Sequence, residues 1–231
     1  MKDLHKIQML ILRELLFKPN STFTKLNIQG LTSDHFSYHI NTLIKDEYVE
    51  KKNGKYSLTP KGKEYANQMD TDEALIEKQP KIAVIIVGIK EENGIKKLLI
   101  QERTKEPYYG YRGFITGKVR FGEKVLETAR RELLEETGLI CDELHLKNIV
   151  HNLVVLEESG DLVEDKMFYI VTAINPKGKL INTRNGKNYW ITEKEFFELD
   201  KKYYDEDNVY RYSLEKKDMD LDEQVFFIKE F

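Results

Sequence analysis

The chain has 231 residues, enough for one large domain or for a small domain and a medium one. Its 40% hydrophobic and 33% charged residues are typical of a soluble globular protein that builds its own core. The single cysteine excludes an internal disulfide and predicts a reducing, cytoplasmic location. Charged residues interrupt every long apolar run, so the sequence predicts no membrane span and no membrane partner.

Charge is distributed unevenly along the chain. Residues 1–70 hold 11 Lys and Arg against 8 Asp and Glu, whereas the remainder holds 26 against 32. Three of the five histidines also lie in the front part. This asymmetry favours a nucleic-acid partner for the front of the chain and a metal or another cationic partner for the back.

The first 70 residues predict helices followed by a hairpin. Apolar residues at helical spacing continue until Pro19 ends the pattern. A short helix is expected around "FTKLNI", and "TSDHFSYHINTLIK" predicts a longer helix with Ser33 as its N-cap. Asn53-Gly54 favours a tight turn between two strand-like runs, and Pro60 then opens another helix.

This order resembles the winged helix-turn-helix of small prokaryotic repressors of the ArsR and MarR types. The stretch "FSYHINTLIKDEYVEKKNGKYSLTPKGKEY" carries the resemblance, which implies a recognition helix in the major groove of duplex DNA and a wing on the phosphates. The implied DNA-binding residues are Ser37, Tyr38, Asn41, Thr42 and Lys45 on the helix, with Lys51, Lys52 and Lys55 on the wing. We interpret the neighbouring His39 as a packing residue. The alternative is a module that only dimerises or binds protein.

The acidic stretch of residues 71–80, closed by a proline, is interpreted as a linker between a domain of residues 1–70 and a second domain of residues 81–200. In the second domain, "KIAVIIVGI" predicts a strand buried on both faces. Asn93-Gly94 favours a hairpin that leads to "KKLLIQER".

Two more strands are expected in "IVHNLVVLE" and "KMFYIVTAI", joined through "ESGD". Thr192 and Glu195 form a capping box that opens a late helix. Together these elements predict an α+β protein: a winged helix-turn-helix followed by an α/β/α sandwich around a mixed sheet. Residues 201–231 remain an unassigned extension.

The stretch "RELLEE" raises the question of what three clustered carboxylates do on one helix. At 100° per residue, Glu132, Glu135 and Glu136 share a sector of about 100°. The apolar stripe formed by Ala129 and Leu133 lies beside that sector, so the carboxylates border the buried face. Like charges at this spacing destabilise a helix. Converging hard oxygen ligands suit Mg²⁺ or Mn²⁺, and such a metal ion would compensate the charge.

The residues around this helix match the Nudix box without a gap or substitution. Gly117 is followed after five residues by Glu123, and after seven more by "REL-L-EE-T-GL" at residues 131–139. On this motif, residues 81–199 are identified as similar to the Nudix hydrolase superfamily. Its members hydrolyse a nucleoside diphosphate linked to another moiety, with divalent metal ions on the pyrophosphate.

The resemblance also implies roles for individual residues. Glu132 and Glu136 would be the principal ligands of Mg²⁺ or Mn²⁺, with help from Glu135 and from the backbone carbonyl of Thr116. Arg131 would orient the carboxylates, and Glu123 would pair with Arg131 or hold the loop. The implied catalytic set is therefore Glu123, Arg131, Glu132, Glu135 and Glu136. The general base is left open among Glu157, Glu158, Glu164, Asp165, a box glutamate and a metal-bound hydroxide.

Substrate contacts are expected just before the box, in "PYYGYRGF". Tyr109 and Tyr111, with their neighbour Tyr108, could stack on a nucleobase, and Arg112 could pair with a phosphate. The alternative is that these rings close the core over the sheet. Gly117 would let the backbone approach the substrate closely. On this basis ADP-ribose or a related dinucleotide is favoured over an oxidised nucleoside triphosphate.

Two functions follow from the sequence. The first is a Mg²⁺-dependent hydrolase with an appended DNA-binding or protein-binding module. The second is a transcriptional regulator, with a homodimer as one possible assembly, whose Nudix domain senses a nucleotide-like metabolite. The combination resembles the Nudix-related regulators of NAD and sugar metabolism, although those carry the winged helix after the Nudix domain. The complete set of box glutamates favours hydrolysis.

Overall fold

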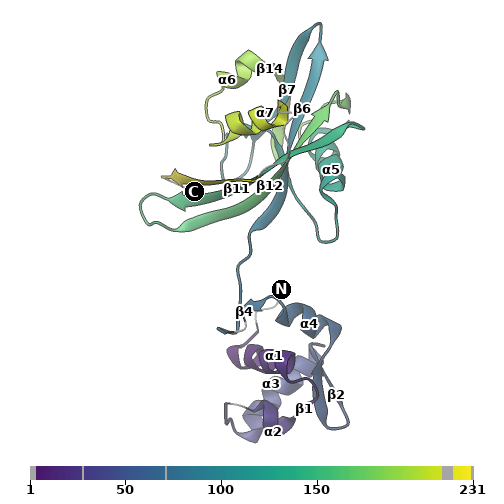
Figure 1. Ribbon diagram of the computed structural model, residues 1–231, viewed down its shortest axis with the longest axis vertical. Helices are drawn as coiled ribbons and strands as arrows, with labels where there is room; N and C mark the ends of the chain where they lie inside the picture. Colours follow the sequence, from purple (N-terminus) through teal and green to yellow (C-terminus); the bar gives the residue numbers. More distant parts are fainter. Residues whose placement is uncertain (1–3, 28, 71, 215–220, 230–231) are drawn as a thin grey trace. The chain divides into compact units, whose positions relative to one another are not determined.

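The computed structural model describes residues 4–27, 29–70, 72–214 and 221–229. It divides the chain into two compact units, Met1–Lys78 and Gln79–Phe231 (Figure 1). Within the described ranges, no helix is both long enough and apolar enough to cross a membrane.

The first unit contains helices and a small sheet. Its elements are α1 (Lys6–Phe17), β1 (Ser21–Thr22), α2 (Phe23–Leu26), α3 (Ser33–Lys45), β2 (Val49–Lys52), β3 (Lys55–Leu58) and α4 (Pro60–Ala66). The three strands form an antiparallel sheet in the order β1-β3-β2. Helix α1 ends before Pro19, and α4 begins at Pro60 with the hydroxyl of Thr59 accepting from the amide of Gly62. These boundaries agree with the predicted elements.

Helix α3 differs from the prediction at its first residue. Thr32 is the N-cap, and Ser33, which the sequence favoured for that position, is already helical. Thr32 has extended backbone angles and its side chain makes no capping hydrogen bond, so the sequence signal for the cap was misplaced by one residue. Phe36 and Ile40 are buried in the core of this unit, as the helical spacing predicts, and His39 is buried beside them.

The predicted linker is largely part of the first unit. Strand β4 (Met69–Asp70) pairs with β5 (Leu75–Ile76). The Asp70 carboxylate accepts from the amides of Asp72 and Glu73, a turn that closes this small hairpin. Residues 72–78 thus belong to the first unit, and the division between the units follows Lys78.

The second unit is built around an eight-stranded sheet. Its elements are β6 (Lys81–Glu92), β7 (Ile95–Arg103), β8 (Arg112–Gly113), β9 (Ile115–Lys118), α5 (Val125–Thr137), β10 (Leu139–Ile140), β11 (Leu144–Leu156), β12 (Leu162–Ile174), β13 (Lys177–Gly178), β14 (Gly186–Thr192), α6 (Glu193–Phe197), α7 (Glu206–Leu214) and β15 (Leu221–Ile228). The main path is β14-β7-β6-β12-β11-β15, with β8 paired to β7 and β9 paired to β6.

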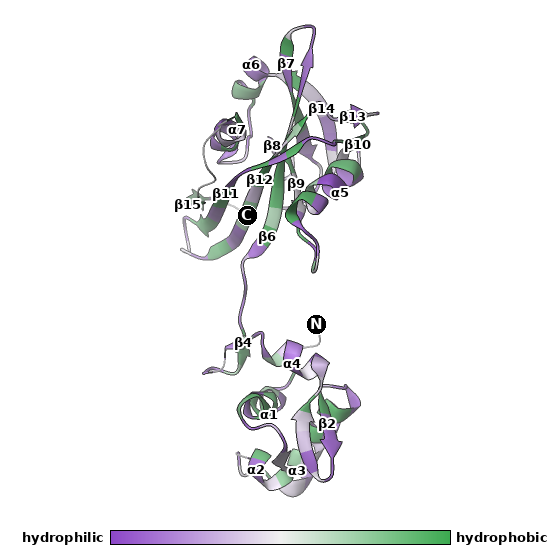
Figure 2. Cartoon of the chain, turned by 45° about the vertical axis from the view of Figure 1, so that its right-hand side comes forward, coloured by the Kyte–Doolittle hydropathy of each residue, from purple (hydrophilic) through white to green (hydrophobic). Residues whose placement is uncertain are grey.

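The sheet is mixed and is covered on both faces. β6 pairs with β12 in parallel, as β11 does with β15, while the other pairs in the sheet are antiparallel. Helix α5 packs on one face, and α6 and α7 pack on the other (Figure 1). Residues 83–88 of β6 are buried throughout, and Figure 2 shows the hydrophobic colouring of the central strands. This arrangement confirms the predicted mixed sheet between helices.

The C-terminal residues, which the sequence left unassigned, complete this sheet sandwich. Helix α7 buries Val209 and Tyr210 against the sheet, and β15 adds an edge strand beside β11. Aromatic residues of this segment are spread among charged ones, which hides the helical stripe in the sequence. The second unit therefore extends well past residue 200.

Candidate active site

Helix α5 carries the three glutamates and has a clear start and end. The Glu127 carboxylate accepts from the backbone amide of Lys124 at 3.2 Å, which satisfies one free donor of the first turn. Gly138 ends the helix with φ of 74°, a left-handed conformation that favours glycine. Ala129 and Leu133 are fully buried against the sheet, as the helical wheel predicts. The glutamates consequently lie along the border between core and solvent.

Arg131 supplies the positive charge among the clustered carboxylates. Its guanidinium donates to both oxygens of Glu123 at 2.7 Å, to Glu132 Oε1 at 2.6 Å and to Glu135 Oε2 at 3.1 Å. These hydrogen bonds from Arg131 are the main reason that the pKa of Glu123 falls to about 2. Arg120 adds a second guanidinium on Glu135 at 3.2 Å. Two of the three clustered glutamates of α5, Glu132 and Glu135, are thus paired with arginines.

Glu132 lies against the backbone of β9. A Cβ atom built on Gly117 would come within 2.0 Å of the carboxyl carbon of Glu132. Any residue other than glycine at position 117 would therefore displace this carboxylate. Burial raises the pKa of Glu132 above its ordinary value. The sequence predicted that Gly117 permits a close approach, and in the structure the approaching group is a glutamate of the same chain.

Glu136 is held by neutral donors from another part of the sheet. Its Oε1 accepts from Asn185 Nδ2 at 2.7 Å, and its Oε2 accepts from Thr183 Oγ1 at 3.1 Å and Gln101 Nε2 at 3.4 Å. Asn188 Nδ2 donates to the backbone carbonyl of Glu136 at 2.6 Å. These partners lie 35 to 52 residues away in sequence, so the pattern of the box does not indicate them.

The donor set on α5 fits a hard divalent cation by its chemistry. It offers carboxylate oxygens at the border of the buried face, and the missing Cβ of Gly117 leaves the space that Glu132 occupies. In the structure, however, Glu132 and Glu135 accept hydrogen bonds from Arg131, and Glu136 accepts from side-chain amides and the Thr183 hydroxyl. Accordingly, the described ranges contain no cluster of three or more His, Cys, Asp or Glu side chains that could hold a metal ion.

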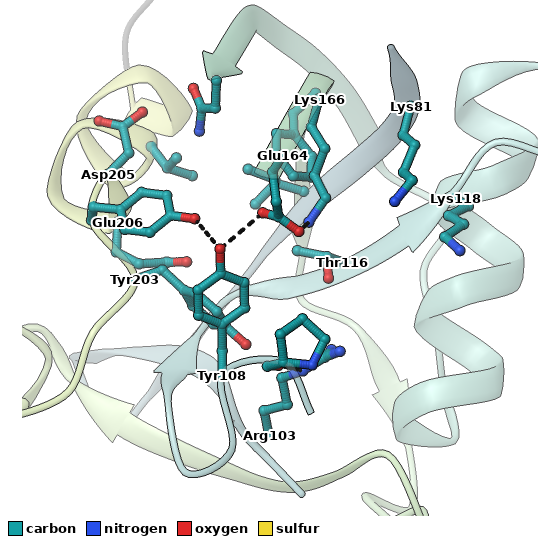
Figure 3. Close-up of a pocket in the computed structure, with 16 residues that line it drawn as sticks. Lys81, Arg103, Tyr108, Thr116, Lys118, Glu164, Lys166, Tyr203, Asp205 and Glu206 are labelled. Carbon is teal, nitrogen blue, oxygen red and sulfur yellow. Dashed lines mark hydrogen bonds and ion pairs between the residues drawn. The ribbon is translucent and has the colours of Figure 1, made fainter. Parts of the chain in front are cut away.

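A cavity of about 340 Å³ lies between the sheet and α7 (Figure 3). Four cationic side chains line it: Lys81, Arg103, Lys118 and Lys166. Its aromatic lining consists of Tyr108, Phe168, Tyr203 and Tyr204, and its acidic or amide lining consists of Asn152, Glu164, Asp205 and Glu206. Cationic groups beside aromatic rings can bind the phosphates and the base of one nucleotide.

The cavity and the glutamates of α5 lie on opposite sides of strand β9. Thr116 lines the cavity, while its neighbour Gly117 faces Glu132. Alternation along a strand explains the arrangement, because successive residues face opposite sides of the sheet. Lys118, the last residue of β9, also lines the cavity. A ligand in the cavity is thus separated from Glu132 only by β9, which ends at Lys118 in the lining of the cavity.

The three substrate residues predicted before the box are not in the lining of this cavity. Tyr109 has 64% of its surface exposed, and Tyr111 packs its ring against Tyr108 at 5.6 Å. Arg112 forms ion pairs with Glu102 at 3.3 Å and with Asp200. The ring that lines the cavity is Tyr108, which the sequence grouped with them.

Some of the side chains that sequence reasoning missed come from the residues after α6. Tyr203 and Tyr204 meet Tyr108 there, and the hydroxyls of Tyr108 and Tyr204 are 2.7 Å apart. The run "KYYDED" was the only available signal, since it combines aromatic and acidic residues beyond the predicted domain.

Of the four acidic residues considered for the general base, Glu164 is the one that lines the cavity. It is buried, accepts from the Tyr108 hydroxyl at 3.1 Å and forms an ion pair with Lys166. The Asp165 carboxylate instead lies 2.9 Å from Nε2 of His151. Glu157 and Glu158 are exposed on the hairpin turn.

Comparisons with known proteins address the second unit. A model of the NUDIX domain matches residues 79–212. One solved structure of similar fold is the NUDIX domain of Shewanella oneidensis NrtR in complex with ADP ribose, which is 16% identical in sequence and has a TM-score of 0.53. The match covers 67% of this chain and 97% of the NrtR domain. The MutT protein of Bacillus halodurans is 22% identical in sequence and has a TM-score of 0.52. That match covers 64% of this chain and 89% of the MutT chain. A search of curated proteins found no match.

Proposed function

Because the chain belongs to the Nudix domain family, we propose that it is a pyrophosphohydrolase that cleaves the diphosphate of a nucleoside diphosphate-linked substrate. The observation that carries the proposal is that the glutamates of α5 and the cavity lie on opposite faces of the same strand, β9. Glu132 packs against Gly117 on one face of β9, and a cavity with cationic and aromatic lining meets Thr116 on the other. ADP-ribose is the first substrate to test, because a protein of the same fold binds it.

Different residues bind the substrate and orient the carboxylates. Lys81 and Lys118 lie at the side of the cavity where Thr116 lies (Figure 3), so they attract the diphosphate toward the end of β9. Arg131 fixes the positions of Glu132 and Glu135 through charge-assisted hydrogen bonds. The rings of the cavity exclude water from the nucleoside.

A divalent cation is the cofactor that we propose for this site. Glu132 and Glu136 would hold Mg²⁺ or Mn²⁺, with Glu135 and the backbone carbonyl of Thr116 as further oxygen donors. When bound, such an ion supplies positive charge to the phosphate oxygens and lowers the pKa of bound water. The neutral donors around Glu136 leave its negative charge uncompensated in the protein alone, which favours a cation there.

The test is hydrolysis of ADP-ribose, NAD(H), nucleoside triphosphates and oxidised nucleotides with and without Mg²⁺ or Mn²⁺. Glu136→Gln should lower kcat by about 100-fold or more, because it removes a ligand charge and little volume. Glu127→Gln is the matched control, since Glu127 lies on the same helix and is exposed. Equal turnover by Glu136→Gln and the parent protein would contradict the proposal.

A second function, binding of duplex DNA by the first unit, rests on the surface of α3 and the β2-β3 hairpin. Tyr38, Asn41 and Lys45 are exposed on one helix, while Lys52 and Lys55 are exposed at the hairpin. We propose that this unit is a winged helix-turn-helix in which α3 enters the major groove. The remaining predicted contacts, Ser37, Thr42 and Lys51, lie on the same helix and hairpin. The alternative for the whole protein is a regulator whose Nudix domain senses its nucleotide.

Fluorescence anisotropy with labelled duplex from upstream of its own gene tests this function. Affinity should fall steeply with salt, because phosphate contacts release counterions. Lys52→Ala should weaken binding to all sequences alike, whereas Asn41→Ala should reduce discrimination between sequences. Lys177→Ala, an exposed lysine of the second unit, is the control. Absence of binding at low salt would instead favour a protein partner.

A further inference from the structure

Glu135 is paired with two arginines, and one of them, Arg120, comes from the loop before α5. Nη2 of Arg120 lies 3.2 Å from Oε2 and 3.3 Å from Oε1 of Glu135. The pair is open to solvent, with 61% of the Arg120 side chain and 47% of the Glu135 side chain exposed. An exposed ion pair of this kind contributes little to stability. Arg120 can therefore leave Glu135 at a small cost in free energy.

The other arginine on Glu135 is fixed in place. Only 16% of the Arg131 side chain is exposed, and its guanidinium also donates to both oxygens of Glu123 and to the backbone carbonyl of Lys118. These bonds do not involve Glu135, so they hold Arg131 when Glu135 changes its partner. Of the two arginines, Arg120 is the one that can give way.

A divalent cation and Arg120 need the same oxygens. Oε2 of Glu135 accepts from both Arg120 and Arg131, which uses the two acceptor sites of that oxygen, and Oε1 also accepts from Arg120. The proposed metal site includes Glu135 as a further oxygen donor. A guanidinium held at this carboxylate also repels a second positive charge. Coordination by Glu135 thus requires that Arg120 move away.

We propose that Arg120 competes with the divalent cation for Glu135 and thereby sets the metal concentration at which the site on α5 fills. Arg120 neutralises Glu135 before the ion binds, and it moves into solvent when the ion takes the carboxylate. The proposal rests on the proposed function for the position of the metal ion. It adds a residue whose role is to weaken the binding of that ion.

Binding of Mn²⁺ to the full chain, measured at pH 7.5 from the EPR signal of the free ion, tests the competition. Arg120→Gln should bind Mn²⁺ about three- to fivefold more tightly than the parent protein, because the ion no longer has to break an exposed ion pair. The gain should shrink at high salt, which screens exposed charges. Glu136→Gln, which removes a proposed ligand, identifies the part of the binding that belongs to α5.

Two controls separate competition for Glu135 from the general effect of a lost positive charge. Arg130→Gln makes the same change on an exposed residue of α5, which points about 160° away from Glu132 at 100° per residue. It should alter the affinity less than about twofold, because the charge is distant and screened. In a Glu135→Gln background the carboxylate that holds Arg120 is absent, so Arg120→Gln should alter the affinity no more than Arg130→Gln does.

Thermal unfolding gives a second readout of the same exchange. With EDTA, Arg120→Gln should lower Tm by roughly 1–3 °C, because the ion pair with Glu135 is lost. With saturating Mg²⁺ the pair is already broken in the parent protein, so the parent and the variant should have the same Tm. An equal loss of Tm in both solutions would indicate a purely structural role for Arg120 and overturn the proposal.

The outcomes separate this proposal from the proposed function. Mn²⁺ binding that depends on Glu136 but is no tighter in Arg120→Gln, or an equal gain in Arg130→Gln or in the Glu135→Gln background, would overturn the competition alone. Absence of any Mn²⁺ binding that depends on Glu136 would contradict the proposed metal site and this proposal together. Tighter binding by Arg120→Gln, in a protein that hydrolyses no diphosphate, would support the competition while contradicting the hydrolase.

Discussion

Replacing Gly117 by alanine tests how closely Glu132 must lie to β9. The added Cβ would be 2.0 Å from the carboxyl carbon and from Cγ of Glu132, whereas ordinary contacts begin at 3.4 Å. Glu132 must therefore move by about 1 Å or more, because Cβ contacts under 3.0 Å are essentially never seen. A misplacement of about 1 Å can cost roughly 100-fold in rate. We expect kcat on the best substrate to fall on the order of 100-fold.

The same clash should lower stability, and this gives an independent assay. Overpacking costs typically about 1–3 kcal/mol, which lowers the Tm of a domain of this size by roughly 2–4 °C per kcal/mol. In a Glu132→Ala background the colliding side chain is absent, so Gly117→Ala should leave Tm almost unchanged. A loss of Tm that is equal in the two backgrounds, or full activity in Gly117→Ala, would refute the close approach.

Three further results are expected. The pKa of His39 in the folded protein is lowered by burial and by the neighbouring His5 and His35. As the pH falls, His39 is therefore protonated in the unfolded chain at a higher pH than in the folded protein. The first unit should lose stability as pH falls below about 6.5, and calorimetry of His39→Gln should show a weaker pH dependence. Tyr204→Ala should raise the KM for ADP-ribose several-fold, because base stacking is worth roughly 1–3 kcal/mol, whereas the exposed Tyr109 should tolerate alanine; the reverse order would contradict the cavity. His151 bonds to Asp165 and Glu223, which raises its pKa, so its stabilising effect is present at low pH and is lost as pH rises through its folded-state pKa; an NMR titration that finds this pKa below 6.5 would contradict the pairing.

Local patterns in the sequence predicted the elements of the chain well. Pro60, the Asn93-Gly94 turn and the Thr192 capping box each act through their own backbone and a neighbour a few residues away, and each lies where the pattern indicates. Helix α5 ends at Gly138 for the same reason. Such signals are readable because the physical cause lies within one or two turns of chain.

The cavity could not be predicted in the same way. It brings the hydroxyl of Tyr108 to that of Tyr204, 96 residues away in sequence, and its lining residues run from Lys81 to Val209. The loop before the box was expected to present its rings to the substrate, yet Tyr109 is exposed and lies outside the cavity lining. Which ring of a Tyr-rich loop faces inward depends on partners that only the folded chain brings together.

Partners of the box glutamates show the same limit. Arg131 lies beside Glu132 in sequence and was expected to orient the carboxylates; it donates hydrogen bonds to Glu132 and Glu135. The donors to Glu136, Asn185 and Thr183, come from the segment before β14. Nothing in the spacing of the box indicates them, because long-range contacts such as the pairing of β14 with β7 and the hydrogen bond from the Ile181 amide to the Thr137 carbonyl bring them to α5.

The central claim is that this chain cleaves the diphosphate of a nucleotide-linked substrate by attack of water on phosphorus. The most direct measurement is mass spectrometry of the products formed from ADP-ribose with Mg²⁺ in ¹⁸O-labelled water. The account predicts AMP and ribose 5-phosphate, with one ¹⁸O atom in the phosphate group of one product, and almost no product from Glu136→Gln. Absence of Mg²⁺-dependent cleavage of every nucleoside diphosphate-linked compound tested, or products labelled on carbon, would contradict it.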